Sequence, residues 1–142
     1  MRFFFYGTLL HGAGNAAAEA VHARLGPGLA ATVGGRLFAL PDPAGGDPGL
    51  LPDPRGPPVH GMVYRTMPEF AATDLAAIDA WEDCRPDGRG EYRRQLLPVA
   101  RAGLGLLAQG YVYNAPLPPG AEPVPGGDFG AFLAQRGLAA FR

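Results

Sequence analysis

The chain opens on an apolar run, four consecutive aromatic residues at positions 3–6, and this run ends at Gly7-Thr8-Leu9. A run that is apolar on both faces must be covered on both faces, so the pattern predicts a fully buried strand. Glycine at its end allows close approach to another group, or dihedral angles closed to other residues. Such a loop leaves peptide N–H groups that can bind an anionic oxygen. The alternative is that Gly7 only turns the chain into the next segment.

Four later segments have the pattern of strands, and they are residues 29–40, 59–64, 92–100 and 105–114. Within the first, Gly34-Gly35 predicts a bulge or a sharp bend. The last two are separated by residues 101–104 alone, so they are predicted to pair as a hairpin. Tyr111 and Tyr113 are two positions apart, which predicts that both lie on the same face of their strand.

Two short helices are predicted near the ends of the chain. Asn15 can cap a helix over residues 16–25 that ends at Gly26, and Asp128 can cap a last helix that ends at Gly137. Asparagine and aspartate accept hydrogen bonds from the N–H groups of a first turn, and glycine suits the position after the last turn.

A longer helix is predicted in the middle of the chain. The sequence Thr66-Met67-Pro68-Glu69 predicts a capping box at its start. Ala71, Leu75 and Ile78 follow at spacings that form one apolar stripe. Four residues further the stripe reaches Glu82, although glutamate is almost never fully buried without a partner.

Two interpretations of Glu82 are open at this point. One is a buried ion pair, for which Arg93 or Arg94 is the candidate partner. The other is a functional acid whose carboxyl pKa is raised by its apolar surroundings.

Composition narrows the class of protein. A length of 142 residues fits a single domain, 1–142, with a real core. The net charge of −1 provides no basic face for nucleic acid, so no such partner is expected. A hydrophobic share of 47% argues against disorder, and the proline- and glycine-rich residues 41–58 are predicted to form a long loop.

Cysteine use and hydropathy indicate a location. The single cysteine, Cys84, excludes an internal disulfide and fits a reducing compartment. No apolar run approaches the roughly 20 residues that span a bilayer, and the N-terminus has no signal-peptide pattern. We therefore expect a cytoplasmic protein without a membrane partner.

The usual nucleophiles and cofactor motifs are missing. Cys84 has no recognisable relation to His11, His22 or His60, and a lone cysteine usually packs as a small hydrophobe. The chain contains no serine and no lysine, which excludes a serine nucleophile and a Schiff base. Scattered histidines do not form a metal site, and no glycine-rich phosphate motif is present, so no metal or cofactor is expected.

Three motifs together resemble the γ-glutamylcyclotransferase-like superfamily, which includes γ-glutamylamine cyclotransferases and plant avirulence-induced proteins. They are Tyr6-Gly7-Thr8-Leu9, Ile78-Asp79-Ala80-Trp81-Glu82 and Tyr92-Arg93-Arg94. The resemblance covers nearly the whole chain, because four further segments fall in the expected order: Gly35-Arg36-Leu37-Phe38, Pro48-Gly49-Leu50, residues 59–64 with Gly61, and Gly127-Asp128-Phe129. In the family's usual motif glycine follows the glutamate, whereas this chain has Asp83.

The resemblance implies an α+β fold, a small mixed β-barrel with flanking helices. It implies a small-molecule γ-glutamyl substrate whose own α-amine attacks its γ-carbonyl, releasing 5-oxoproline and a free amine. The substrate thus supplies its own nucleophile. Well-oriented intramolecular reactions reach effective molarities of about 10⁵–10⁸ M.

In that reaction the implied catalytic residue is Glu82, which takes a proton from the substrate ammonium and gives one to the leaving nitrogen. Burial against Leu75 and Ile78 is expected to raise its pKa, and ionised Asp83 to push the same way.

The implied substrate-binding residues are Tyr6, Gly7, Thr8, Leu9 and Tyr111. The peptide N–H groups of residues 7–9 would hold anionic or developing oxyanionic oxygens, while strand geometry does not separate Tyr111 from Tyr113. Two alternatives stay open. One is an enzyme acting on a γ-glutamyl group carried by a natural-product intermediate or an ε-lysyl adduct, with specificity in residues 41–58. The other is a non-catalytic binding or interaction module on the same fold.

Overall fold

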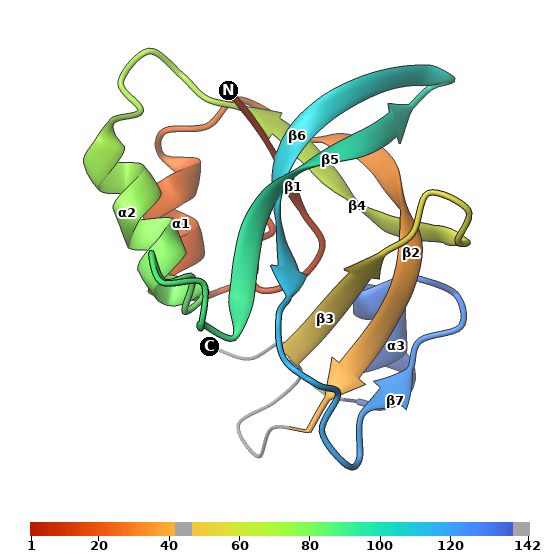
Figure 1. Cartoon of the computed structure of the whole chain (residues 1–142). Coiled ribbons are helices and arrows are strands. Elements are labelled where there is room, and N and C mark those ends of the chain that lie inside the picture. The colour runs from red at the N-terminus through yellow and green to blue at the C-terminus, as the bar shows by residue number, and fades with distance from the viewer. Residues whose placement is uncertain (42–46, 138–142) are drawn as a thin grey trace.

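The fold is built around a closed five-stranded barrel (Figure 1). The structure is a computed structural model that describes residues 1–41 and 47–137. Around the barrel the strands are β2 (Leu29–Leu40), β4 (Pro58–Arg65), β1 (Arg2–Phe5), β6 (Leu104–Tyr113) and β5 (Tyr92–Arg101). Pairing of Thr32 with Ala100 closes the ring. Because β1 runs parallel to β6 and the other pairs are antiparallel, the expected mixed barrel is confirmed.

The first strand is buried on both faces, as predicted. Phe4 and Tyr6 face the core inside the barrel, whereas Phe3 and Phe5 belong to a second core outside it. Neither Phe3 nor Phe4 has any exposed surface. Neighbours on both sides therefore hold β1 in place, and with it the loop that follows.

The strand β2 contributes to two sheets, and the change occurs at Gly34-Gly35. Residues 29–34 pair with β4, and residues 35–40 pair with β3 (Asp47–Pro52). A Cβ atom on Gly34 would lie 2.6 Å from a backbone oxygen of Asp53, and one on Gly35 would lie 2.7 Å from that of Leu51. Glycine is thus required here, and the predicted bend is confirmed. The short strand β7 (Glu122–Pro123) pairs with the same half of β2.

The strand β3 corrects the prediction of one long loop over residues 41–58. Leu50 has no exposed surface and pairs with Leu37, so the apolar pair within this segment belongs to a strand. Its prolines are tolerated because β3 is an edge strand, where a missing N–H removes no ladder bond. Residues 42–46 of that prediction lie outside the described residues.

The helices at the two ends of the chain begin where their caps predict. In α1 (Ala16–His22) the Asn15 side chain accepts the N–H of Ala18, and in α3 (Phe129–Gln135) Asp128 accepts that of Ala131. The first helix is shorter than expected. It ends at His22 because Leu25 is drawn into a β-bridge with Thr66.

The predicted capping box of the middle helix is wrong. The Thr66 N–H and hydroxyl both donate to the Met1 carbonyl, at 2.9 and 3.2 Å, so Thr66 prolongs the sheet instead. The helix α2 (Ala72–Trp81) begins six residues later than the threonine, and Asp74 accepts the N–H of Ala71 at 2.8 Å.

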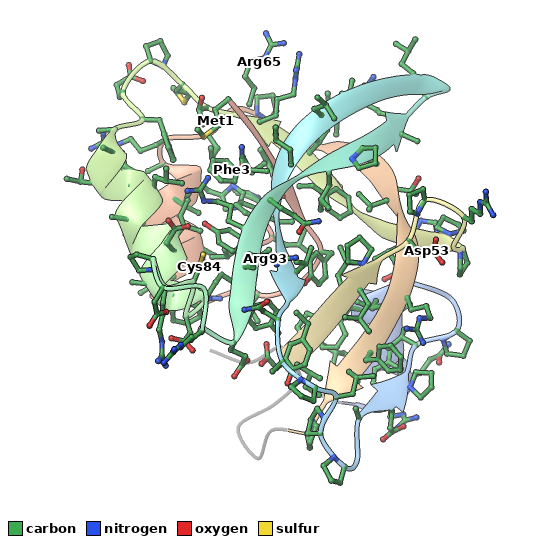
Figure 2. All side chains as sticks on the ribbon, viewed as in Figure 1. Met1, Phe3, Asp53, Arg65, Cys84 and Arg93 are labelled. Atoms are coloured by element: carbon green, nitrogen blue, oxygen red, sulfur yellow. The ribbon has the colours of Figure 1, made fainter. Side chains whose placement is uncertain are left out.

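Helices α1 and α2 lie side by side on the outside of the barrel (Figure 1), and Figure 2 shows Phe3 between them and the strands. Of the predicted stripe on α2, Ile78 is buried, Leu75 half-buried and Ala71 exposed. At the other end of the molecule, α3 contributes Phe129 and Leu133 to the core inside the barrel. None of the described helices is both long and apolar enough to cross a membrane.

Candidate active site

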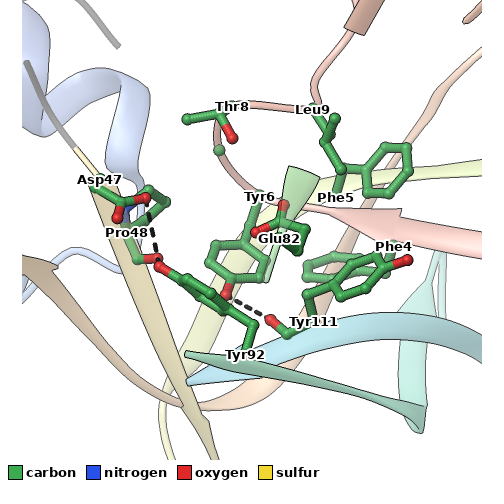
Figure 3. A pocket seen from close by; sticks show the side chains of 11 residues that line it. Phe4, Phe5, Tyr6, Thr8, Leu9, Asp47, Pro48, Glu82, Tyr92 and Tyr111 are labelled. Carbon is green, nitrogen blue, oxygen red and sulfur yellow. Dashed lines mark hydrogen bonds between the residues drawn. The ribbon is translucent and has the colours of Figure 1, made fainter. Parts of the chain in front are cut away.

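A cavity that is open to solvent lies where the end of β1, the start of β3, the end of α2 and strands β5 and β6 meet (Figure 3). It is lined by Phe4, Phe5, Tyr6, Gly7, Thr8, Leu9, Asp47, Pro48, Glu82, Tyr92 and Tyr111. The six site residues expected from sequence therefore border one cavity. Its described lining contains two carboxylates and no basic side chain.

Glu82 is placed at this cavity by the end of α2. It is the C-cap residue, and the chain reverses at Asp83, whose φ of 49° is left-handed. The N–H of Cys84 donates to the Asp79 carbonyl at 2.8 Å, and that of Asp83 to the Ala80 carbonyl at 3.2 Å. These two bonds form a Schellman motif, which fixes the point where the Glu82 side chain leaves the backbone.

Asp83, which stands where the resemblance leads one to expect glycine, adopts the positive φ that this turn requires. Aspartate is one of the few residues enriched at positive φ. Its carboxylate accepts hydrogen bonds from Arg85 Nε at 2.7 Å and from the Glu91 N–H at 3.0 Å. The Arg85 bond lowers the pKa of Asp83. This carboxylate is thus engaged by the following turn and does not line the cavity.

Burial, followed by the charges of Asp47 and Glu91, raises the pKa of Glu82 to about 8. The expected contribution from Asp83 is therefore replaced by one from Asp47, which lines the cavity. The residue as a whole is half-buried because it borders the cavity, although protein atoms closely surround its carboxyl group. A carboxyl group with this pKa can gain and lose a proton near neutral pH.

The ion-pair interpretation of Glu82 is wrong for both candidate arginines. Arg94 Nε lies 3.0 Å from a carboxylate oxygen of Asp79, and the Arg93 guanidinium donates to Gln95 at 3.2 Å. Within residues 1–41 and 47–137, no salt bridge includes Glu82.

The loop formed by residues 7–9, which we call the amide loop, borders the same cavity. None of its three N–H groups donates to another backbone group of the described chain. Gly7 lies against Pro48, since a Cβ atom at position 7 would come within 2.3 Å of the Pro48 ring. Glycine is therefore needed for close packing, one of the two uses that the sequence predicts for it. Free N–H groups at a cavity can bind an anionic oxygen.

Three tyrosines line the cavity: Tyr6, Tyr92 and Tyr111. The Tyr6 hydroxyl donates to the Tyr111 carbonyl at 2.6 Å, and the Tyr111 hydroxyl donates to Asp79 at 2.6 Å. The Tyr92 hydroxyl lies against the Pro48 carbonyl and, at 3.3 Å, an Asp47 oxygen. Burial raises the pKa of all three phenols, which keeps them protonated as donors.

The structure separates the two tyrosines of β6 that the sequence left equivalent. Tyr111 lines the cavity, whereas Tyr113 packs edge-on against the ring of Tyr92. Sequence reasoning missed the roles of Asp47 and Pro48 in the lining. Both lie in the segment predicted as a loop, and no spacing rule brings that segment to the amide loop.

The other candidates are not assembled into sites. Cys84 is half-buried and packs against the core between the helices and the barrel, as a small hydrophobe would. His11 and His22 contact each other edge-on, with ring centres 5.2 Å apart, and neither lines the cavity of Glu82. Among the described residues, no three His, Cys, Asp or Glu side chains are arranged to hold a metal ion.

The comparisons with known proteins agree with this architecture. A family model described as "Gamma-glutamyl cyclotransferase, AIG2-like" matches residues 3–131. Among curated protein sequences no match is found.

Solved structures share the fold at low sequence identity. An AIG2-like protein from Mus musculus has a TM-score of 0.62 and 22% identity, over 82% of this chain and 79% of that chain. A protein from Arabidopsis thaliana has a TM-score of 0.61 and 20% identity, over 96% and 83%. A structure named gamma-glutamyl cyclotransferase has a TM-score of 0.57 and 21% identity, over 88% and 72%.

Proposed function

Because the chain belongs to the gamma-glutamyl cyclotransferase, AIG2-like family, we propose that it cyclises the γ-glutamyl group of a small amide or amine. The products are 5-oxoproline and the free amine. The observation that carries the proposal is Glu82, a carboxyl group with a pKa of about 8, across one cavity from the N–H groups of the amide loop.

The charges of the cavity suit such a substrate. A γ-glutamyl group carries an α-carboxylate and an α-ammonium. The described lining has no basic side chain, and the N–H groups of residues 7–9 can donate to the carboxylate. The ammonium then lies towards Glu82 and Asp47, whose carboxylates attract a cation.

Glu82 is the proton carrier in the reaction that we propose. It removes one proton from the ammonium, and the resulting amine attacks the γ-carbonyl carbon to close a five-membered ring. Glu82 then delivers that proton to the leaving nitrogen as its bond to the γ-carbon breaks. It next accepts the second proton of the attacking nitrogen, which leaves with the released amine as ammonium, so the ring nitrogen of 5-oxoproline keeps one hydrogen. Such positioned proton transfer contributes on the order of 10²–10⁴-fold.

The raised pKa of Glu82 fits both halves of this cycle. A carboxyl group of ordinary pKa would be a weak base towards an ammonium group. At a pKa of about 8 the carboxylate is a stronger base, and its conjugate acid can still protonate the leaving nitrogen. The substrate's positive charge favours ionisation of Glu82 on binding.

Tyr6 and Tyr111 are proposed as substrate-binding residues. Their phenols form a connected layer beneath the carboxyl group, because Tyr6 donates to the Tyr111 carbonyl and Tyr111 donates to Asp79. This layer supplies flat apolar surface for the methylene carbons of a γ-glutamyl chain and restricts the conformations that the chain can adopt.

The decisive experiment is incubation with a panel of γ-glutamyl dipeptides and γ-glutamylamines, with 5-oxoproline and the released amine measured together. We expect both products in equal amounts from at least one compound. Compounds that bind in calorimetry without any turnover would instead support the non-catalytic binding module. A panel that includes γ-glutamyl-ε-lysine and carrier-linked γ-glutamyl amides also tests the alternative substrates.

A further inference from the structure

Every carbonyl group of the amide loop already accepts a hydrogen bond. The three bonds are Leu10 N–H to Gly7 O at 3.1 Å, Asn15 Nδ2 to Thr8 O at 2.7 Å, and His22 Nε2 to Leu9 O at 2.7 Å. A carbonyl oxygen only accepts, so Nε2 of the histidine carries the proton. Two side chains of α1 and its cap therefore hold the loop from one neighbouring element.

These carbonyl bonds also decide where the N–H groups point. The two groups of a trans peptide unit point in opposite directions, and none of the described peptide bonds is cis. Holding the Thr8 carbonyl thus sets the direction of the Leu9 N–H, which belongs to the same unit. That N–H donates to no described backbone group, and Leu9 lines the cavity.

Asn15 is built into this arrangement by both ends of its amide. Its Nδ2 donates to the Thr8 carbonyl, and its Oδ1 accepts the Ala18 N–H at 2.8 Å. Only 6% of the residue is exposed. A helix cap needs the acceptor alone, and serine, threonine or aspartate would supply it. The cap therefore does not need the NH₂ group of the Asn15 amide, and this group holds the amide loop through its bond to the Thr8 carbonyl.

We propose that Asn15 is a positioning residue for the anion site, acting through the Thr8 carbonyl to keep the Leu9 N–H directed into the cavity. The inference rests on the proposed function only in naming the anion, the α-carboxylate of the γ-glutamyl group. His22 holds the next peptide unit in the same way, by donating to the Leu9 carbonyl. Because burial lowers the pKa of His22, its ring stays neutral, so its Nδ1 remains unprotonated near neutral pH.

The variant that separates the two halves of the amide is Asn15→Asp. Aspartate keeps the acceptor for the Ala18 N–H and loses the donor to the Thr8 carbonyl, where it places a second oxygen. The matched control is Asp128→Asn, which makes the reverse exchange at the cap of α3 and leaves its Ala131 bond available. Asn15→Ser, which keeps a capping oxygen without a new charge, serves if the aspartate variant does not fold.

The anion site can be tested without any turnover, by titrating acetate and following the Leu9 and Thr8 amide resonances by NMR. We expect acetate to shift them in the natural protein and in Asp128→Asn. In a folded Asn15→Asp or Asn15→Ser protein the acetate affinity should fall about tenfold, as for the loss of one hydrogen bond to a charged group. Unchanged affinity in a folded variant would overturn the proposal, as would no shift in the natural protein.

Turnover of a γ-glutamyl substrate gives an independent test of the role of Asn15. If 5-oxoproline is released, the Asn15 variants should raise KM for the γ-glutamyl substrate about tenfold while the pH midpoint set by Glu82 stays in place. If no γ-glutamyl compound reacts but acetate binding still depends on Asn15, the proposed function fails and the positioning role stands. A loss of stability with unchanged KM and acetate affinity would assign Asn15 to helix capping alone.

Discussion

The two walls of the cavity work by different physical means. The amide loop presents peptide N–H groups, whose charge does not change with pH and whose direction depends on neighbouring packing and hydrogen bonds. The opposite wall presents Glu82 and Asp47, whose charge does change with pH. One wall is therefore sensitive to small displacements, and the other to electrostatic surroundings.

This contrast teaches that the two walls should fail differently when altered. A change that moves the amide loop should weaken recognition of an anion at every pH. A change in the charge of the carboxylate wall should instead alter how activity and stability depend on pH.

Glu82→Gln should lower kcat by about 10²–10⁴-fold, because glutamine has a similar shape and cannot carry the proton. Folding should be retained, since the described residues form no salt bridge with Glu82. The measurement is 5-oxoproline release with circular dichroism as the folding check. Glu69→Gln is the control, because Glu69 is exposed and outside the cavity. A Glu82→Gln protein with near-normal release would refute the assignment.

Gly7→Ala should break the amide loop. A Cβ atom at this position would lie 2.3 Å from the Pro48 ring, so the loop or β3 must move. We expect a loss of stability of about 1–3 kcal/mol, as for other overpacked sites. Because a displacement of about 1 Å can reduce a rate about 10²-fold, kcat/KM should fall by that order at every pH.

The control for this change is Gly126→Ala. Gly126 is exposed, and a Cβ atom there would meet no heavy atom within 4 Å. Thermal unfolding and kcat/KM are measured for both variants. If Gly7→Ala retains the kcat/KM of the natural protein, the close contact with Pro48 is not needed for binding.

Much of this architecture could be predicted from local patterns. The aromatic run at residues 3–6 marks a strand buried on both faces, and Gly34-Gly35 marks the bend in β2. These predictions succeed because each depends on a local feature of the sequence. Residues 3–6 have no polar face, and Gly34-Gly35 has no side chains to prevent close packing of the backbone. The start of α2 was misplaced because a tertiary contact, from Thr66 to the Met1 carbonyl, takes the threonine that a capping box would use.

The candidate site was predictable only in part. Glu82 and the amide loop stand out because each breaks a local rule, an acid on an apolar stripe and a glycine at the end of a buried strand. Asp47 does not stand out, since it is one polar residue in a proline-rich segment. Its place beside Tyr92 follows from β3 pairing with β2, a contact between distant parts of the chain.

The titration of Glu82 should also make the free energy of unfolding depend on pH. The pKa of Glu82 is about 8 in the folded protein, against an ordinary value of 4.5. Between those pH values the folded state keeps a proton that the unfolded chain has released, so stability falls as the pH rises. Relative to Glu82→Gln, the natural protein should lose several kcal/mol between pH 4 and 9, roughly four to five at most.

The measurement is the free energy of unfolding in urea for both proteins at several pH values. Subtracting the two curves removes the titrations that they share. A difference that stays constant from pH 4 to 9 would mean that Glu82 titrates normally, and the proton carrier would then lack its raised pKa.

Asp47→Asn should have the smallest effect and is the sharpest probe of the carboxylate wall. After burial, the charge of Asp47 is the largest cause of the raised pKa of Glu82, so its removal should lower that pKa. The rising limb of kcat/KM against pH should then move to lower pH, because the free enzyme ionises earlier. Asparagine retains an oxygen for the Tyr92 hydroxyl, and the amide loop is untouched. Asp53→Asn, an exposed turn residue outside the cavity, should leave the profile in place. A loss of kcat/KM in Asp47→Asn at all pH values, with an unmoved midpoint, would show that Asp47 acts on the substrate alone.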